Sequence, residues 1–249
     1  MLLLLGALAI IATIYALVNT STAARAAGAP QSETAVEEGR ALYLEGCASC
    51  HGLNAEGTSV APNLIGAGAA SVHFQVSTGR MPLAAPTVQV DRKEPSYNEE
   101  QTAALAAYIA TLGPGPASPT PEQLDTTNAD LAVGGELFRT NCAQCHNFAG
   151  SGAALTEGKF APSLMQSTPQ QVWEAMLTGP QNMPVFGDGT LDEGEKQDIL
   201  KYVAHLQNQT QPGGLSLGSF GPVAEGALLF TLGLGLMAGF AVWIGAKVR

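Results

Sequence analysis

Two short motifs concentrate the residues that could do chemistry in this chain. One reads CASCHG at residues 47–52 and the other reads CAQCHN at residues 142–147; together they hold all four cysteines and two of the four histidines. C-x-x-C-H is the attachment signature of c-type haem, in which two thiols bind the haem and the histidine binds its iron. The motifs predict two covalently bound haem c groups, attached at Cys47, Cys50, Cys142 and Cys145, with His51 and His146 as iron ligands.

Two other chemistries use the same cysteine spacing: a redox-active thiol pair and half of a zinc site. A zinc site usually needs further Cys or His ligands nearby, and each half of this chain has only its own three. A redox pair does not explain a histidine directly after the second cysteine in both halves. Haem attachment is therefore the interpretation that the motifs favour.

Two methionines occupy matched positions downstream of the motifs. Met81 in STGRMPL and Met183 in TGPQNMPVF each precede a proline, 30 residues after His51 and 37 residues after His146. A methionine thioether is a soft ligand that favours ferrous iron and raises the reduction potential. Both are predicted to be the sixth iron ligands. Methionine is commonly a core residue, and the methionines without a counterpart, Met165 and Met176, are interpreted that way.

Other residues could shape the two sites. Pro62 and Pro162 follow the motifs at matched places and could direct a backbone carbonyl at Nδ1 of each iron-binding histidine. His73 could compete with Met81 for iron, but the matched region of the second half has no histidine, and His205 lies near the end of a predicted helix. Both are interpreted as packing or surface residues. Aromatic residues are expected to wall the haem clefts: Tyr43, Phe74 and Tyr108 in one half, and Phe138, Trp173 and Tyr202 in the other.

The motifs belong to a larger repeat, which indicates a duplicated domain. The segment that ends at Cys47 aligns with the one that ends at Cys142, Thr78-Gly79 aligns with Thr178-Gly179, and each half ends in a helix-like pattern containing a tyrosine. Few alternating β-branched runs occur, so residues 30–221 are predicted to be mostly helical. The expected division is 1–29 (membrane helix or signal anchor), 30–112 (first domain), 113–133 (linker), 134–210 (second domain), 211–225 (linker) and 226–249 (membrane helix and tail).

The charge of the chain argues against one class of partner. The net charge is −10, and residues 30–221 contain 20 acidic against 8 basic side chains. Nucleic-acid binding requires basic patches, so it is excluded. An acidic surface suits a basic docking partner through electrostatic steering, and it also keeps a domain soluble; the composition leaves both readings open.

Both ends of the chain are apolar. Residues 226–246 carry no charge over 21 residues, long enough to cross a bilayer, and Lys247 and Arg249 follow. Near the N-terminus, residues 2–18 form a second apolar run. Ala24-Arg25-Ala26 resembles a signal cleavage site, but no basic stretch precedes the run, which favours a retained helix. We expect a cell-membrane protein that spans the lipid twice, with residues 30–221 outside the cytoplasm.

Each half resembles a class I cytochrome c domain: a helix ending in C-x-x-C-H, a Pro-x-Leu turn, Met-Pro and a closing helix with a tyrosine. With its FQVSTGRMP, LTGPQNMP and FGPVAEG segments and its final membrane helix, the chain resembles the dihaem cytochrome cc subunit of the actinobacterial cytochrome bcc complex. The resemblance implies tandem all-α cytochrome c domains between two transmembrane helices, and His–Met iron ligation.

The resemblance also implies a function within quinol:cytochrome c reductase. The subunit would carry electrons from a Rieske iron–sulfur protein through two haems to a terminal cytochrome c oxidase, while a cytochrome b subunit performs the quinol chemistry. Sequence order favours the haem at Cys47 as the acceptor of electrons. The alternatives are a dihaem subunit of another respiratory dehydrogenase or oxidase, and a dihaem peroxidase, which would need an open sixth iron position.

Overall fold

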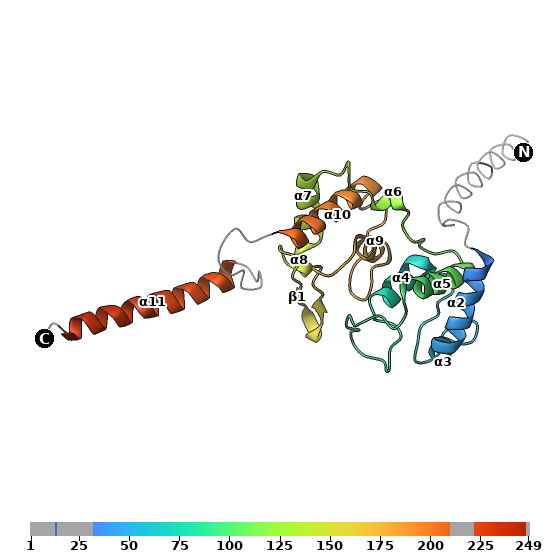
Figure 1. The fold of residues 1–249 in the computed structure, drawn as a ribbon, viewed down its shortest axis with the longest axis horizontal. Coiled ribbons are helices and arrows are strands. Elements are labelled where there is room, and N and C mark those ends of the chain that lie inside the picture. Colours follow the sequence, from blue (N-terminus) through green and yellow to red (C-terminus); the bar gives the residue numbers. More distant parts are fainter. Residues whose placement is uncertain (1–12, 14–31, 210–221, 248–249) are drawn as a thin grey trace, which may run out of the picture. The chain divides into compact units, whose positions relative to one another are not determined.

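The computed structural model describes residue 13 and residues 32–209 and 222–247. The N-terminal membrane helix expected within 1–29 lies outside the described residues, Thr13 excepted. Helices account for most of the described chain (Figure 1). They are α2 (Glu33–Gly46), α3 (Ala48–His51), α4 (Gly68–Ser77), α5 (Glu99–Thr111), α6 (Pro121–Leu124), α7 (Leu131–Asn141), α8 (Ala143–His146), α9 (Pro169–Thr178), α10 (Glu193–Asn208) and α11 (Pro222–Lys247), with a 3-10 turn η1 (Thr156–Gly158).

The fold is mostly helical, but the described residues also contain one small antiparallel strand pair, which the all-α expectation did not include. Strand β1 (Ala153–Ala154) pairs with β2 (Phe160–Ala161). Between the strands, Glu157 and Gly158 adopt positive φ angles of 59° and 72°, which allow the chain to reverse tightly. The two strands are only a few residues apart in the chain, so they can pair without the longer alternating pattern from which a strand is predicted.

The chain divides into two compact units that do not follow the linear domain boundaries. The first unit comprises residues 1–125 together with Thr168–Glu193, and the second comprises residues 126–167 and 194–249. Helix α9 and the Met183 loop thus belong to the first unit, although the repeat places them in the second half. Within the first unit, α9 packs against α4.

The core of the first unit forms where α2 crosses α5. Gly39 of α2 faces the backbone of Ala104, and a Cβ on Gly39 would collide with that carbonyl oxygen and lie 2.9 Å from Cβ of Tyr108. One turn later, the rings of Tyr43 and Tyr108 lie 5.4 Å apart. Leu105 and Ile109 complete this buried cluster. The missing side chain at Gly39 therefore permits the close approach on which the aromatic packing depends.

The second unit repeats this crossing with α7 and α10. A Cβ on Gly134 would collide with the backbone carbonyl of Asp198. One turn along α7, the rings of Phe138 and Tyr202 lie 5.3 Å apart. Gly134 precedes Cys142 by the same eight residues that separate Gly39 from Cys47. The sequence repeat is therefore confirmed as a repeat of local geometry.

Helices α4 and α9 also end in the same way. Thr78 Oγ1 donates to the carbonyl of Phe74 at 2.6 Å, and Thr178 Oγ1 donates to that of Glu174 at 2.7 Å. The following glycine has a positive φ in both cases, 66° at Gly79 and 57° at Gly179. A left-handed glycine ends a helix and turns the chain. The turn directs each chain into the loop that carries Met81 or Met183.

Helix α11 differs from the rest of the described chain. Its segment Glu225–Lys247 has a mean hydropathy of 2.1 and none of it is buried against the protein. Among the described residues it is the one helix long and apolar enough to cross a membrane. Lys247 Nζ lies 4.7 Å from the centre of the Trp243 ring, so a basic group and an indole stand together at the helix end, an arrangement common at a membrane–water interface.

Candidate haem sites

The first C-x-x-C-H motif forms a single helical turn directly after α2. The Cys47 amide donates to the Tyr43 carbonyl at 2.8 Å, and the His51 amide donates to the Cys47 carbonyl at 3.0 Å. Cys47 and Cys50 are both free thiols, with Cys50 exposed. The motif therefore occupies one short helix, α3, with its preceding residue Cys47.

The His51 ring is held in one tautomer. Its Nδ1 lies 2.8 Å from the carbonyl oxygen of Pro62, and a carbonyl can only accept, so Nδ1 carries the hydrogen. In a neutral ring, this leaves the lone pair on Nε2. The ring is 8% exposed. The carbonyl of Pro62 thus accepts from Nδ1, as the sequence suggested, and this hydrogen bond orients the ring and strengthens it as an electron donor.

The second motif reproduces this arrangement within its own unit. His146 Nδ1 donates to the carbonyl oxygen of Pro162 at 2.9 Å, and burial lowers the pKa of the His146 imidazole, which favours the neutral ring that a metal requires. The loops match too. The Gly57 amide donates to the His51 carbonyl at 2.7 Å, and the Gly152 amide donates to the His146 carbonyl at 2.9 Å. His51 and His146, which lie in separate units, are therefore oriented by the same kind of hydrogen bond.

The first cysteine of each motif is not an activated thiolate. Burial raises the pKa of the Cys142 thiol to about 11 and also raises the pKa of the Cys47 thiol, with the neighbouring cysteine as the second cause. In redox-active C-x-x-C pairs, the pKa of the attacking thiol is lowered. The environment of these cysteines differs from that of a redox pair in this respect.

The two methionines lie on loops that follow α4 and α9. Met81 is partly buried and packs against the core cluster that contains Tyr43 and Tyr108, and Cys47 packs against the same cluster. Met183 is also partly buried, and its amide donates to the Pro180 carbonyl at 3.1 Å. Met183 belongs to the first unit and His146 to the second, so each is described within its own unit. The pairing of Met183 with His146 remains a prediction from the repeat.

A buried cation beside Met81 was not anticipated from the sequence. The Arg80 guanidinium is buried and stacks over the Phe74 ring, 5.0 Å from its centre. Its Nε has no hydrogen-bond partner among the described residues, and burial lowers the pKa of the side chain. Haem carries two carboxylates, and a buried cation needs an anion. Two thiols, an imidazole, a thioether and a buried guanidinium whose Nε lacks a hydrogen-bond partner among the described residues together fit haem c.

Removal of this buried charge is expected to lower the reduction potential of the haem at Cys47. A positive charge near iron favours the ferrous state, so Arg80→Met should lower that potential by on the order of tens of millivolts. Arg40→Met removes an equal charge from an exposed position, where solvent screens it, and should change little. Redox titration of both variants measures the difference; equal shifts would show that burial of Arg80 is irrelevant to the haem.

The remaining histidines have the packing and surface roles predicted for them. His205 is exposed on α10. His73 is 5% exposed, and its ring nitrogens face Glu174 at 2.7 Å and Glu99 at 3.1 Å. Glu174 was not predicted to contact His73, although a carboxylate within the otherwise apolar stretch VWEAML was a signal.

Of the two methionines predicted to be core residues, Met176 is buried, whereas Met165 is 36% exposed, so that prediction is wrong for Met165. Met165 lies on a loop between β2 and α9, where its neighbours Leu164 and Ser167 interact with Gln207 through their backbone carbonyls. Burial of a residue in a helix can be predicted from the regular spacing of apolar residues around it. Met165 lies on a loop, where no such spacing exists, so the sequence could not show whether it is buried.

Comparisons with known proteins agree with these features. The cytochrome c family profile matches residues 36–113, and the profile for cbb3-type cytochrome c oxidase subunit III matches residues 129–203. The cytochrome bc1 complex cytochrome c subunit of Mycobacterium leprae (strain TN) is 46% identical over 252 residues, which cover 99% of this chain and 87% of the relative.

Two further relatives carry the same name. The protein of Corynebacterium efficiens is 41% identical, with 95% of this chain and 85% of the relative covered. That of Mycobacterium tuberculosis (strain ATCC 25618 / H37Rv) is 44% identical, with 98% and 89% covered. Identity at this level over nearly the whole chain shows common descent. The chain therefore belongs to the family of cytochrome bc1 complex cytochrome c subunits, respiratory electron-transfer proteins whose cytochrome c domains indicate covalently bound haem c.

Proposed function

We propose that this chain is a membrane-anchored electron relay with two c-type haems, one at each C-x-x-C-H motif. The observation that carries the proposal is the duplicated histidine geometry: His51 and His146 each donate Nδ1–H to a proline carbonyl, at 2.8 and 2.9 Å. A carrier with one haem would not need a second histidine held in this way. The matched Met-Pro segments support a His–Met ligand pair for each haem.

The side chains of this protein would hold and tune the two groups. Cys47 and Cys50, like Cys142 and Cys145, form thioether links that keep the haem from dissociating. The proline carbonyls orient the imidazoles and strengthen them as donors, and Met81 and Met183 would each bind a haem iron through their thioether, which would keep water and small molecules from it. When bound, haem c supplies reversible one-electron chemistry between ferric and ferrous iron.

The relay is proposed to act between membrane partners. In this proposal, a Rieske iron–sulfur protein delivers electrons to the first domain, the second domain delivers them to a terminal cytochrome c oxidase, and a cytochrome b subunit oxidises quinol. Helix α11 and a second helix within residues 1–29 would anchor the chain in the lipid, with the haem domains on the extracytoplasmic side. The excess of 12 acidic side chains over residues 30–221 supports docking against basic surfaces.

A second candidate function has a specific observation in its favour. The match of residues 129–203 to a cbb3-type oxidase subunit also suits a chain that belongs to an oxidase and receives electrons from elsewhere. The two functions share the same haem chemistry and differ in their partners. The proteins that accompany the chain therefore distinguish them.

The haem count and the partners test the proposal together. The membrane complex, purified in mild detergent, is expected to contain two haem c per copy of this chain and to include a cytochrome b and a Rieske protein. Replacing both cysteines of either motif by serine should leave one covalent haem, because each motif serves only its own domain. One haem in the unaltered chain would contradict the relay, and an oxidase without cytochrome b and Rieske partners would favour the second candidate.

A further inference from the structure

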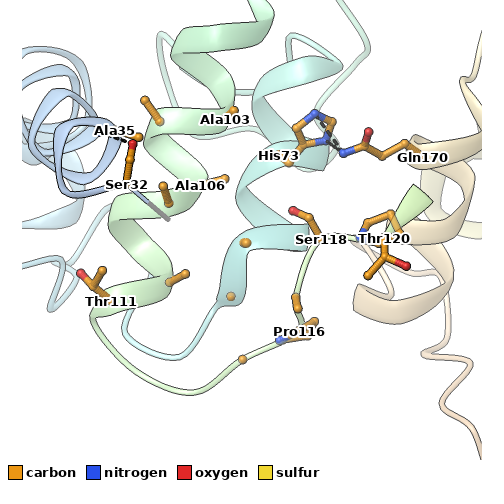
Figure 2. Close-up of a pocket in the computed structure, with 18 of the residues that line it drawn as sticks. Ser32, Ala35, His73, Ala103, Ala106, Thr111, Pro116, Ser118, Thr120 and Gln170 are labelled. Atoms are coloured by element: carbon orange, nitrogen blue, oxygen red, sulfur yellow. Dashed lines mark hydrogen bonds between the residues drawn. The ribbon is translucent and has the colours of Figure 1, made fainter. Parts of the chain in front are cut away.

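A buried acid–base pair joins α4 to α9 within the first unit. His73 Nδ1 donates to Glu174 Oε2 at 2.7 Å, and the Glu174 side chain is fully buried. Gln170 on α9 also faces the imidazole (Figure 2), with its amide nitrogen 3.2 Å from Nδ1 and 3.3 Å from Nε2. The same amide donates to Glu174 Oε1 at 3.0 Å. A carboxylate with no solvent access is costly unless it is paired. Neither residue belongs to the C-x-x-C-H motifs.

Further polar contacts join helix α9 to the first half of the chain. Besides the His73–Glu174 pair, Gln171 donates to Ser77 Oγ at 3.2 Å and accepts from Arg92 at 3.1 Å. Further along, Gln181 donates to the Val90 carbonyl at 3.0 Å. Hydrogen bonds are directional, whereas apolar contacts tolerate sliding. These hydrogen bonds therefore fix the position of α9 more precisely than apolar contacts alone would.

The position of α9 is passed on to the loop that carries Met183. The helix ends at Gly179, and a Cβ there would lie 2.8 Å from the Met183 carbonyl. The Met183 amide donates to the Pro180 carbonyl at 3.1 Å, and the Phe186 amide donates back to the Met176 carbonyl at 2.8 Å. Met183 therefore lies on a short loop whose two ends are both fastened to α9, and the loop moves with the helix.

We propose that His73 and Glu174 are positioning residues for the second haem: the pair holds α9 on α4 and so determines where Met183 is presented. The inference rests on the proposed function for one point, that Met183 is an iron ligand. The new element is that an acid–base pair, with one residue from each half of the repeat, determines the position of Met183. Neither residue touches the cofactor in this scheme.

The charges around His73 make this arrangement dependent on pH. Glu174 of α9 and Glu99 at the start of α5 face the ring directly, and the ring borders a cavity of about 1140 Å³. The other carboxylates that line this cavity are Glu38, Glu100 and Glu122. Burial opposes the imidazolium, but hydrogen bonds and charge from Glu174 and Glu99 outweigh it, so the pKa of His73 is raised. Burial also raises the pKa of Glu174.

The sign of the pH effect follows from these two directions. Both groups bind a proton more tightly in the folded protein than in the unfolded chain. The stabilising contribution of His73 is therefore complete below the ordinary histidine pKa of ~6.5 and is lost as the pH rises through the raised pKa of His73. That of Glu174 is complete below the ordinary Glu pKa of ~4.3 and is lost as the pH rises through the raised pKa of Glu174. Attachment of α9 to α4 is expected to weaken at alkaline pH.

The test compares three variants of the intact membrane complex with the unaltered protein. His73→Leu leaves the buried Glu174 carboxylate without its imidazole, Glu174→Gln keeps the volume and the hydrogen bond but removes the charge, and the exchange His73→Glu with Glu174→His restores an acid–base pair. Glu100→Gln removes an exposed carboxylate nearby and is the matched control. Two properties are measured between acid and alkaline pH: amide hydrogen exchange in 169–178, and the charge-transfer absorption that reports methionine bound to ferric haem.

His73→Leu is expected to speed amide exchange in α9 on the order of a hundredfold and to reduce the methionine band of one haem, leaving the other unchanged. Glu174→Gln should keep both bands and weaken the pH dependence of the band that His73→Leu reduces. The exchanged pair should recover much of the protection, and Glu100→Gln should match the unaltered protein. Unchanged exchange and bands in His73→Leu would overturn the inference.

Failure of the proposed function would look different. If the unaltered complex shows a methionine band from only one haem, Met183 is not a ligand, and that part of the proposed function is wrong. Hydrogen exchange in α9 does not depend on the haem ligand, so it still decides whether the pair holds the helix. Slow exchange that His73→Leu leaves unaltered would then refute the role of the pair on its own.

Discussion

Replacing Met81 by alanine is expected to lower the reduction potential of one haem by on the order of hundreds of millivolts and to leave the other unaltered. A thioether stabilises ferrous iron, and its loss leaves water or a harder ligand, which favours ferric iron. Met183→Ala should have the same effect on the other haem, because the repeat assigns one methionine to each site. The two single variants therefore assign the two potentials to the two motifs.

The measurement is a spectroscopic redox titration of the purified complex, with the methionine–iron charge-transfer band recorded in the oxidised state. Met165→Leu is the control, because Met165 is partly exposed on a loop and is assigned to neither haem; it should change neither potential nor band. If Met81→Ala left both bands intact, another residue would be the ligand. His73 is a poor replacement, since both of its ring nitrogens already have partners.

Adding one methyl group at Gly39 or Gly134 is expected to destabilise the corresponding domain by about 3 kcal/mol or more. In both cases the new Cβ would collide with a backbone carbonyl oxygen, that of Ala104 or Asp198. A backbone atom cannot rotate away as a side chain can, so the two helices must separate. Separation would also disrupt the packing of Tyr43 on Tyr108, or of Phe138 on Tyr202.

Calorimetry of the purified complex measures the loss as a lower unfolding temperature, together with the yield of covalent haem. Gly187→Ala is the matched control, because a Cβ there would meet nothing within 4 Å, and its effect should stay within about 1 kcal/mol. Equal stability of Gly39→Ala and Gly187→Ala would show that the helices do not depend on close contact at Gly39.

Much of the haem chemistry could be predicted because it is local. Cys47, Cys50 and His51 come together on one helical turn, so their spacing along the chain already specifies their arrangement in space. The hydrogen bonds from His51 to Pro62 and from His146 to Pro162 span short loops, and the repeat pointed to both. The crossing at Gly39 was less evident, because a single glycine within a helix has several ordinary explanations.

The burial of Arg80 and of Glu174 could not be predicted from the sequence. The sequence contains Arg80 as one of eight basic residues within 30–221, and only the folded chain shows that its guanidinium is buried against Phe74. Nothing in the order of residues indicates that α9, which the repeat assigns to the second half, packs on α4 of the first. Burial of a charged group depends on all of its neighbours, and these come from distant segments.

The sequence by itself determined the cofactor chemistry, the duplication and the apolar C-terminal segment, because each depends on residues close together in the chain or on composition. The tertiary structure decided which helix carries the Met183 loop and what holds that helix. His73 and Glu174 stand 101 residues apart, and an imidazole recognises a carboxylate only across a distance of a few ångströms. Only folding can bring two such groups within that range and remove the water that would otherwise screen them.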